Sequence, residues 1–224
     1  MRPSIIIPTW NEEVALPVTL AALRRDFDGE ILVVDGGSTD RTRVVASLAD
    51  RVLVAPPSRA SQMNFGAREA SGDILLFLHA DCTLESGALE EALRHLRRPD
   101  VAAGCFQMSI PQPDRLYRSI EACATARVRL FGIIYGDQGF YLRRETFERA
   151  GGFPNLRLME DIFLSLRLRR IGRIAVANKR IFVSARRWQR TGIVRQTLRN
   201  WALTALAAAG VHPNRLARYY PSIR

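Results

Sequence analysis

Several polar side chains that could do chemistry stand directly after runs of apolar residues. The clearest case is Ile74–Leu78, which is followed at once by His79, Ala80 and Asp81. Such runs are typical of strands buried in a parallel sheet, and ligands of these sheets bind beyond the carboxyl ends of the strands. A carboxylate there can hold a divalent cation against a phosphorylated ligand. Because Asp after a strand is also a common turn or capping residue, Asp81 alone leaves both interpretations open.

Two earlier apolar runs end in the same way. The run Ser4–Pro8 precedes Thr9–Glu12, and the run Glu30–Val34 precedes Asp35. The carboxyl ends of neighbouring parallel strands meet at one edge of a sheet. We therefore expect a crevice for a polar ligand at this edge.

Strand and helix patterns alternate along the first hundred residues. The expected strands are 4–8, 30–34, 51–55 and 74–78, and the expected helices are 12–25, 41–48, 61–70 and 87–97. Asn11 is placed to cap the first helix. This alternation predicts βαβ units, and hence an α/β fold with a parallel sheet.

The second half is less regular. It has strand patterns at 101–110, at 139–143 and once or twice within 173–183, helical patterns at 116–131, 160–171 and 189–209, and a loop at 151–154. In the last helix an apolar stripe of Val194, Leu198, Trp201 and Ala205 lies opposite Arg195 and Arg199, which predicts an amphipathic segment. No linker or repeat divides the chain, so we expect a single domain of residues 1–224.

The charge is unevenly distributed. The 224 residues carry 33 Lys and Arg against 22 Asp and Glu, and the segment 162–224 holds 14 of the basic residues and no acidic one. Such a segment suits nucleic acid, anionic lipid or a phosphorylated substrate, or forms a solvated basic surface. The chain has no zinc-finger, helix-turn-helix or aromatic RNA-binding pattern, which argues against nucleic acid.

The cysteines and the apolar runs indicate in which cellular compartment the protein is expected. Cys82, Cys105 and Cys123 are odd in number and form no CxxC pair, which fits a reducing cytoplasm. No secretory signal precedes the first strand, and the uncharged run 201–211 has 11 residues, too few to span a bilayer. We expect a cytoplasmic protein, with peripheral association at the inner membrane face as an alternative.

Three segments, in order and spacing, resemble glycosyltransferase family 2. They are Ser4–Glu13 (SIIIPTWNEE), Val33–Thr42 (VVDGGSTDRT) and Phe77–Asp81 (FLHAD). The resemblance covers roughly residues 4–190, with Gly151–Pro154 and Met159–Asp161 similar to later landmarks of the family. The segments 59–67 and 136–140 are similar to a small branch found in bacterial biosynthetic clusters, some of them linked to arsenosugar formation.

The resemblance implies a GT-A fold, a Rossmann-like and mostly parallel sheet flanked by helices. Residues 1–110 would form the half that binds a nucleotide-sugar donor, residues 111–190 the acceptor half, and residues 191–224 a basic amphipathic helical segment. The implied activity is that of an inverting, metal-dependent, non-processive glycosyltransferase of the hexosyltransferase type, and the implied donor is a UDP-sugar.

The resemblance also assigns roles on the donor side. Pro8, Thr9 and Glu12 would line the nucleoside pocket, and Asp35 would bond the base, with Arg59 nearby. Asp81 would ligate Mg²⁺ or Mn²⁺ at the diphosphate. A single carboxylate suffices because Mg²⁺ completes its coordination with phosphate oxygens and water.

His79 and Ala80 complete the donor-side set. His79 stands where the family has a carboxylate. Its imidazole suits a transition metal better than Mg²⁺, but it can instead bond a phosphate or ribose, or simply pack. Its role therefore stays open.

On the acceptor side, Asp161 would be the base that accepts the proton of the acceptor hydroxyl, opposite the leaving group. Glu160 and Asp161 in the first turn of a helix are also what the helix dipole favours without any catalytic purpose. Glu160 would position the acceptor. Asp137 and Gln138 would bind acceptor hydroxyls or only form a turn.

The segment Arg186–Trp188 is similar to the Q-x-x-R-W element of processive family members, but the Gln is missing from its place, which argues against a processive synthase. Arg187 would neutralise diphosphate, and Trp188 would stack on a sugar.

Other functions remain as alternatives. A nucleotidyltransferase also uses carboxylates at strand ends, but it should have a basic, glycine-rich loop after the first strand, where Thr9–Glu13 is acidic. A non-catalytic module could bind anionic membrane or nucleic acid through the basic segment 162–224. The amphipathic helix could also pack in the core or form a homodimer.

Overall fold

The chain folds around one central sheet. Successive side chains of its strands point to opposite faces, and the apolar ones are buried on both faces. The computed structural model describes residues 1–220, so the last four residues of the expected segment 191–224 lie outside the described part. In β1 (Pro3–Thr9), Ile5 and Ile7 enter one hydrophobic core and Ile6 enters the other. In β4 (Ile74–Phe77), Leu76 enters the first of these cores and Leu75 enters the second. Buried parallel strands need this double-sided apolar pattern.

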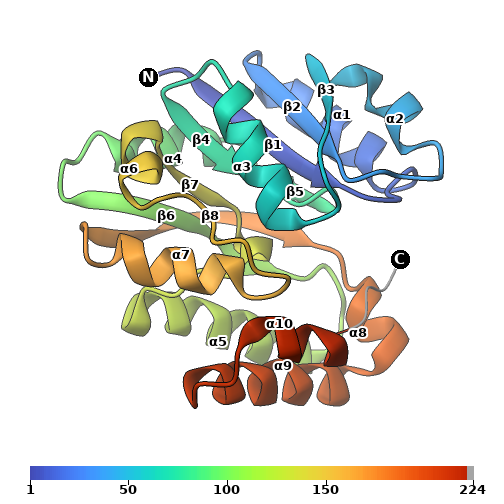
Figure 1. Ribbon diagram of the computed structural model, residues 1–224, viewed down its shortest axis with the longest axis vertical. Helices are drawn as coiled ribbons and strands as arrows, with labels where there is room; N and C mark the ends of the chain where they lie inside the picture. Colours follow the sequence, from blue (N-terminus) through green and yellow to red (C-terminus); the bar gives the residue numbers. More distant parts are fainter. Residues whose placement is uncertain (221–224) are drawn as a thin grey trace.

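The sheet has eight strands in the order β3-β2-β1-β4-β7-β6-β8-β5 (Figure 1). The remaining strands are β2 (Glu30–Asp35), β3 (Arg51–Val54), β5 (Cys82–Leu84), β6 (Val101–Ser109), β7 (Phe140–Arg143) and β8 (Arg173–Val183). Strands β1 to β4 pair in parallel, as do β6 and β8, whereas β7 and β5 run antiparallel to their neighbours. The expected mostly parallel α/β fold is therefore confirmed.

Helices cover both faces of the sheet. One core receives α1 (Leu16–Asp26) and α4 (Ala88–Leu96), and the other receives α3 (Arg59–Glu69), α6 (Arg144–Arg149) and α7 (Glu160–Leu168). The other helical segments are α2 (Thr42–Val45), η1 (Ala46–Leu48), α5 (Arg115–Phe131), η2 (Gly136–Gln138), α8 (Arg186–Thr191), α9 (Ile193–Ala208), α10 (Pro213–Leu216) and η3 (Ala217–Tyr219). No helix within residues 1–220 combines the length and apolarity that crossing a bilayer requires.

Three expected helices differ clearly from the structure, and the one expected at 41–48 is divided into the short α2 and η1. The helix expected at 12–25 begins at Leu16, and Asn11 does not cap it, because the Asn11 side chain instead accepts a hydrogen bond from the Thr39 amide. The helix expected at 189–209 divides at Gly192, whose φ of 90° ends α8 before α9 begins. Short elements that sequence periodicity did not indicate, β5 and α6, complete the fold.

Helix α3 lies unusually close to the sheet. A β-carbon at Gly66 would come within 2.5 Å of Ile6 Cγ2 and 3.0 Å of Val34 Cγ2, so only glycine fits this contact. One turn earlier, Gln62 Nε2 donates to the carbonyl oxygens of Thr9 and Val34 at 2.7 Å each. The helix thereby fixes the carboxyl ends of β1 and β2 relative to each other.

The antiparallel strands determine which loops meet at that edge. Phe140 pairs with Phe77, so β7 begins where β4 ends. Val183, the last residue of β8, pairs with Cys82. The residues before β7 and after β8 therefore lie beside the His79–Asp81 tip, although more than fifty residues separate each of them from it in sequence.

Gly66→Ala tests the close approach of α3. An alanine on an open helix surface stabilises by up to about 1 kcal/mol relative to glycine. At position 66 we expect the opposite sign, a loss of about 1–3 kcal/mol in the free energy of unfolding, because the methyl group overpacks against Ile6 and Val34. Urea unfolding followed by circular dichroism measures it. The exposed Arg68→Ala in the same helix should stay within about 0.5 kcal/mol of the parent, and a stabilised Gly66→Ala would contradict the contact.

Candidate active site

A cavity of about 220 Å³ lies at the carboxyl edge of the sheet, between the two halves of the chain. Its wall combines strand ends, the η2 turn, the start of α7 and the C-terminal helices. Its lining residues are Pro8, Thr9, Glu12, Arg59, Gln62, His79, Ala80, Asp81, Tyr135, Gly136, Asp137, Leu158, Met159, Asp161, Ile162, Val183, Ser184, Arg186, Arg187, Trp188, Asn200, Leu203, Thr204 and Tyr220. The loops that line it therefore come from distant parts of the sequence.

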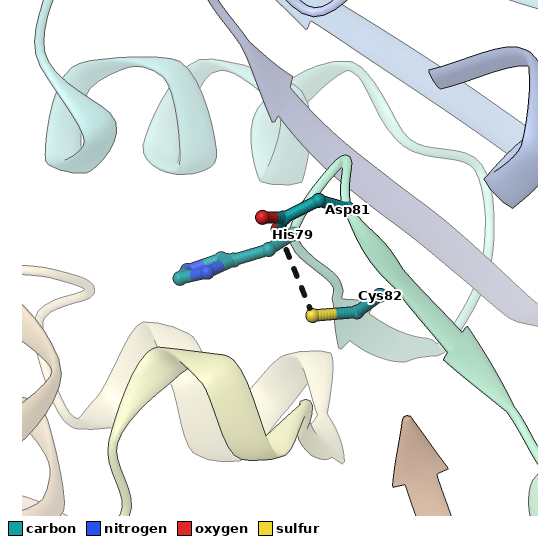
Figure 2. A group of neighbouring side chains, drawn as sticks. All are labelled: His79, Asp81 and Cys82. Carbon is teal, nitrogen blue, oxygen red and sulfur yellow. Dashed lines mark hydrogen bonds between the residues drawn. The ribbon is translucent and has the colours of Figure 1, made fainter. Parts of the chain in front are cut away.

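The tip after β4 offers three potential metal-binding side chains. Figure 2 shows His79, Asp81 and Cys82 projecting from this tip, and their ligand atoms all lie within 4.8 Å of one another. The Cys82 thiol donates weakly to Asp81 Oδ1 at 3.9 Å. Burial, and secondarily the charge of Asp81, raise the pKa of Cys82 well above its usual value, so the sulfur stays protonated. The nitrogen of His79 and the oxygens of Asp81 are the better donors.

An arginine joins two carboxylates in front of this tip. Arg186 Nη2 lies 2.8 Å from Glu12 Oε2 and 2.8 Å from Asp81 Oδ2. Burial is the largest single effect on the pKa of Arg186 and lowers it, but the hydrogen bonds that Arg186 donates to Asp81 and Glu12, together with their charges, raise the pKa above its usual value. The two carboxylates thus converge on one positive charge. Oxygen donors around a cationic centre, with an imidazole nearby, fit a divalent ion such as Mn²⁺ or Mg²⁺.

Asp161 also lines the cavity, in the first turn of α7. Its Oδ2 accepts from the Gly136 amide at 2.6 Å and its Oδ1 accepts from the Ile162 amide at 2.8 Å. A β-carbon at Gly136 would lie 2.8 Å from His79 Nε2 and 3.4 Å from Asp161 Oδ2. The bare backbone of Gly136 therefore fills the space between the β4 tip and the α7 carboxylate.

Three residues expected to bind ligand lie behind the cavity wall. Asp35 is fully buried, and its carboxylate accepts from the amides of Gly37 and Ser38 at 3.1 and 3.0 Å. Glu160 is 2% exposed and forms an ion pair with Arg59 Nε at 2.9 Å. Gln138 is fully buried, and its Oε1 accepts from Arg127 at 2.5 Å. None of these three is among the described residues that line the cavity, and ligand binding by them stays a prediction.

The remaining expected residues line the cavity with different partners. Trp188 is 7% exposed, packs edge to face on Tyr117 and donates from Nε1 to Thr197 at 3.3 Å, so only a small part of the indole faces the cavity. The guanidinium of Arg187 lies 4.5 Å from the ring centroid of Tyr220. The C-terminal segment therefore covers one side of the cavity through a cation–π contact.

Two buried oxygens in this region lack hydrogen-bond donors among the described residues. They are Asp137 Oδ1 and Glu160 Oε2. Burial raises the pKa of Asp137 to about 6, with Arg127 opposing the shift and Asp161 adding to it. Burial also raises the pKa of Glu160, which Arg59 opposes. Unpaired buried oxygens are costly, and they are expected where a polar ligand or an ion completes a site.

Sequence reasoning missed several residues of the wall. Arg186, rather than Arg187, contacts the carboxylates, and adjacent arginines at the start of a helix gave no signal for which one points inward. Tyr220 reaches the cavity only because α9 and α10 return the chain to it. Gln62 lies three residues after Arg59, one helical turn further on, and that spacing could have placed both on the cavity side of α3.

Comparison with known proteins finds a family whose model matches this chain. The model of the family described as "Glycosyl transferase family 2" matches residues 4–157. A Mycobacterium tuberculosis protein named "PGL/p-HBAD biosynthesis glycosyltransferase" is 32% identical over 165 residues, which cover 70% of this chain and 53% of that protein. This chain spans about half the length of the curated relatives that it matches.

Solved structures share the fold. The mannosyltransferase PcManGT from Pyrobaculum calidifontis, in complex with GDP-Man and Mn²⁺, superposes with a TM-score of 0.62 at 24% identity, over 79% of this chain and 55% of that one. Residues 1–349 of TarS from S. aureus, in complex with UDP-GlcNAc, superpose with a TM-score of 0.63 at 19% identity, over 82% and 58%. At these identities the similarity establishes the fold alone.

The raised pKa of Asp137 predicts a pH-dependent stability. The folded chain binds this proton more tightly than the unfolded chain, whose carboxyl has a pKa near 3.8, so the stability from Asp137 is lost as the pH rises from about 4 through about 6. Asp137→Asn imitates the neutral form. At pH 7.5 it should be more stable than the parent by at most about 3 kcal/mol, and near pH 4 the two should be equal.

Urea unfolding at pH 4, 5.5 and 7.5 measures this difference. The exposed Asp28→Asn, between α1 and β2, serves as the control for removal of a carboxylate charge. A difference between Asp137→Asn and the parent that stays constant over this pH range would show that Asp137 titrates normally.

Proposed function

This chain belongs to glycosyltransferase family 2, and from that premise we propose that it transfers a sugar from a nucleotide-diphosphate sugar to an acceptor hydroxyl, with inversion and without processivity. The observation that carries the proposal is the placement of Asp81 and Asp161 on one cavity, from opposite halves of the chain. A transferase of this kind needs a site for the leaving diphosphate and a base across the sugar from it. This arrangement favours sugar transfer over nucleotidyl transfer and over a purely non-catalytic module.

In this proposal the donor occupies the side of the cavity formed by the strand ends. Pro8, Thr9 and Glu12 line the nucleoside pocket, and Ala80 and His79 lie beside the diphosphate. Asp35 supports this pocket through the Gly37 and Ser38 amides, which it holds in place. A uridine nucleotide is the donor we favour, and the UDP-GlcNAc complex of TarS, which has the same fold, is consistent with it.

Asp81, with Glu12 and His79 close by, would hold the divalent ion, Mg²⁺ or Mn²⁺. When bound, such an ion supplies positive charge to the departing diphosphate. Arg186 already forms ion pairs with Asp81 and Glu12, so it must release them, at least in part, for an ion to bind. The released guanidinium lies where it can bind diphosphate oxygens.

On the acceptor side, Asp161 accepts the proton of the attacking hydroxyl. The hydroxyl oxygen forms a bond to the anomeric carbon while the bond from that carbon to the diphosphate oxygen breaks. The Gly136 amide fixes Asp161 Oδ2 by its 2.6 Å hydrogen bond, so the carboxylate is oriented before the acceptor arrives. Because base and leaving group lie on opposite faces of the sugar, the product is inverted.

The acceptor would lie against the C-terminal side of the cavity. Asp137 and Arg187 supply polar contacts, and Trp188 offers the exposed edge of its ring. Glu160 and Gln138 act indirectly, through Arg59 and Arg127. The chain would work in the cytoplasm, which its three unpaired cysteines fit. Peripheral membrane binding and a homodimer are further proposals.

Asp81→Ala tests the donor site. Without this carboxylate we expect UDP binding in the presence of Mn²⁺ to weaken at least about tenfold, and binding in EDTA to stay unchanged, because only the metal-dependent part is removed. Isothermal titration calorimetry measures both. Arg186→Ala should bind Mn²⁺ alone more tightly than the parent, because no guanidinium competes for the carboxylates. If neither UDP nor GDP binds the parent in a metal-dependent way, the donor site is misassigned.

Asp161→Asn tests the base. The loss of general-base catalysis should lower the turnover number for sugar transfer by about 10²–10⁴, while the UDP affinity stays within about threefold. A screen of nucleotide sugars by UDP or GDP release first identifies the donor, and a change of anomeric configuration, read by proton NMR, checks inversion. Normal transfer by Asp161→Asn would rule out this residue as the base.

A further inference from the structure

The apolar stripe of helix α9 faces solvent instead of the core. Val194 is 59% exposed, Leu198 56% and Trp201 56%. The alanines that continue this side of the helix, Ala202, Ala205, Ala208 and Ala209, are exposed as well. Figure 1 shows α9 as the outermost helix, at the end of the molecule away from β1 to β3. A stripe that spans the whole helix is far more than the single exposed apolar residues usual on protein surfaces.

The opposite side of α9 is the one that packs. Gln196 is fully buried and Leu203 is 5% exposed. Asn200, Leu203 and Thr204 line the cavity, and Arg199 turns toward Tyr220, with its guanidinium 5.5 Å from the ring centroid. The polar and mixed side of α9 therefore packs against the rest of the protein, and its apolar side is exposed to solvent.

The charge around this stripe selects the partner. Residues 186–220, which include α8, α9 and α10, contain seven Arg and no Lys, Asp or Glu, and Arg195 is exposed on α9 beside the stripe. A second copy of the chain docked through the same stripe would offer no acidic residue from this segment to pair with Arg195. Anionic lipid headgroups offer the opposite charge, and the acyl region accepts Leu198 and Trp201.

We propose that the exposed stripe of α9, formed by Val194, Leu198, Trp201 and Ala205, docks this protein on an anionic lipid bilayer. The helix lies in the plane of the interface, with its apolar side chains among the upper acyl chains. Arg195 contacts the headgroups. Tryptophan is suited to this position because its ring is apolar and its N–H is polar. The cavity wall formed by Asn200 and Thr204 then lies on the side of α9 that faces away from the bilayer.

Vesicle flotation tests this proposal without any sugar donor, so its outcome is independent of the proposed transfer activity. The probes are vesicles of phosphatidylcholine alone and vesicles with about one third phosphatidylglycerol, at about 0.05 M and about 0.5 M NaCl. We expect the parent to float with the anionic vesicles at low salt, with at least about tenfold weaker partitioning to neutral vesicles or at high salt.

The double variant Leu198→Asp/Trp201→Asp should lose at least about tenfold in partitioning, and Arg195→Gln should lose less. Val18→Asp is the matched control, because Val18 is 64% exposed on α1, near the other end of the molecule, and it should stay within about twofold of the parent. Far-UV circular dichroism checks folding, and the single variant Val194→Asp replaces the double variant if that one unfolds.

Two outcomes would overturn the proposal. One is equal flotation of the parent and of a folded α9 variant. The other is a parent that ignores anionic vesicles and instead sediments as a dimer, which Leu198→Asp/Trp201→Asp converts to a monomer. That second result assigns the stripe to a second copy of the chain.

Discussion

The close contact between α3 and the sheet is the constraint on which the site depends. Gly66 lets this helix approach β1 and β2 closely, and Gln62 then binds the carbonyl groups at both strand ends. From the same helix, Asn64 exchanges two hydrogen bonds with the backbone of Phe153, and Arg59 pairs with Glu160. One helix therefore fastens the strand ends that form the donor side to the loop and helix that form the acceptor side. A larger residue at position 66 would move all of these contacts together.

Paired charges dominate the cavity between these two sides. Arg186 forms ion pairs with both Glu12 and Asp81, and Arg59 forms one with Glu160, so part of the negative charge is compensated from within the chain. Buried carboxylates without such partners would be protonated or would destabilise the fold. Asp137 lies outside these ion pairs, its pKa is raised to about 6, and one of its oxygens has no donor among the described residues. A charged ligand that enters this cavity exchanges partners with residues that are already ordered, which limits the cost of reorganisation.

The C-terminal helices close the cavity and also shape the outer surface. Helix α9 contributes Asn200, Leu203 and Thr204 to the wall, and α10 leads to Tyr220, whose ring lies under the guanidinium groups of Arg187 and Arg199. Because the polar side of α9 is used inside, its apolar side remains exposed. In most amphipathic helices of globular proteins the apolar stripe packs on the core, whereas in α9 this stripe faces solvent.

The sequence by itself determined the α/β fold, the strands β1 to β4, and the position of His79–Asp81 at a strand end, because apolar runs and polar strand ends are local patterns. The resemblance to glycosyltransferase family 2 rested on such local segments too. Only the tertiary structure decided that Arg186 reaches Glu12 and Asp81, that Asp35 and Glu160 lie behind the wall, and that α9 turns its apolar side outward. These facts depend on strand pairings such as Phe77 with Phe140 and Cys82 with Val183, which join residues far apart in the chain. Local periodicity carries no information about such pairings, since it records which residues share a face and not what that face meets.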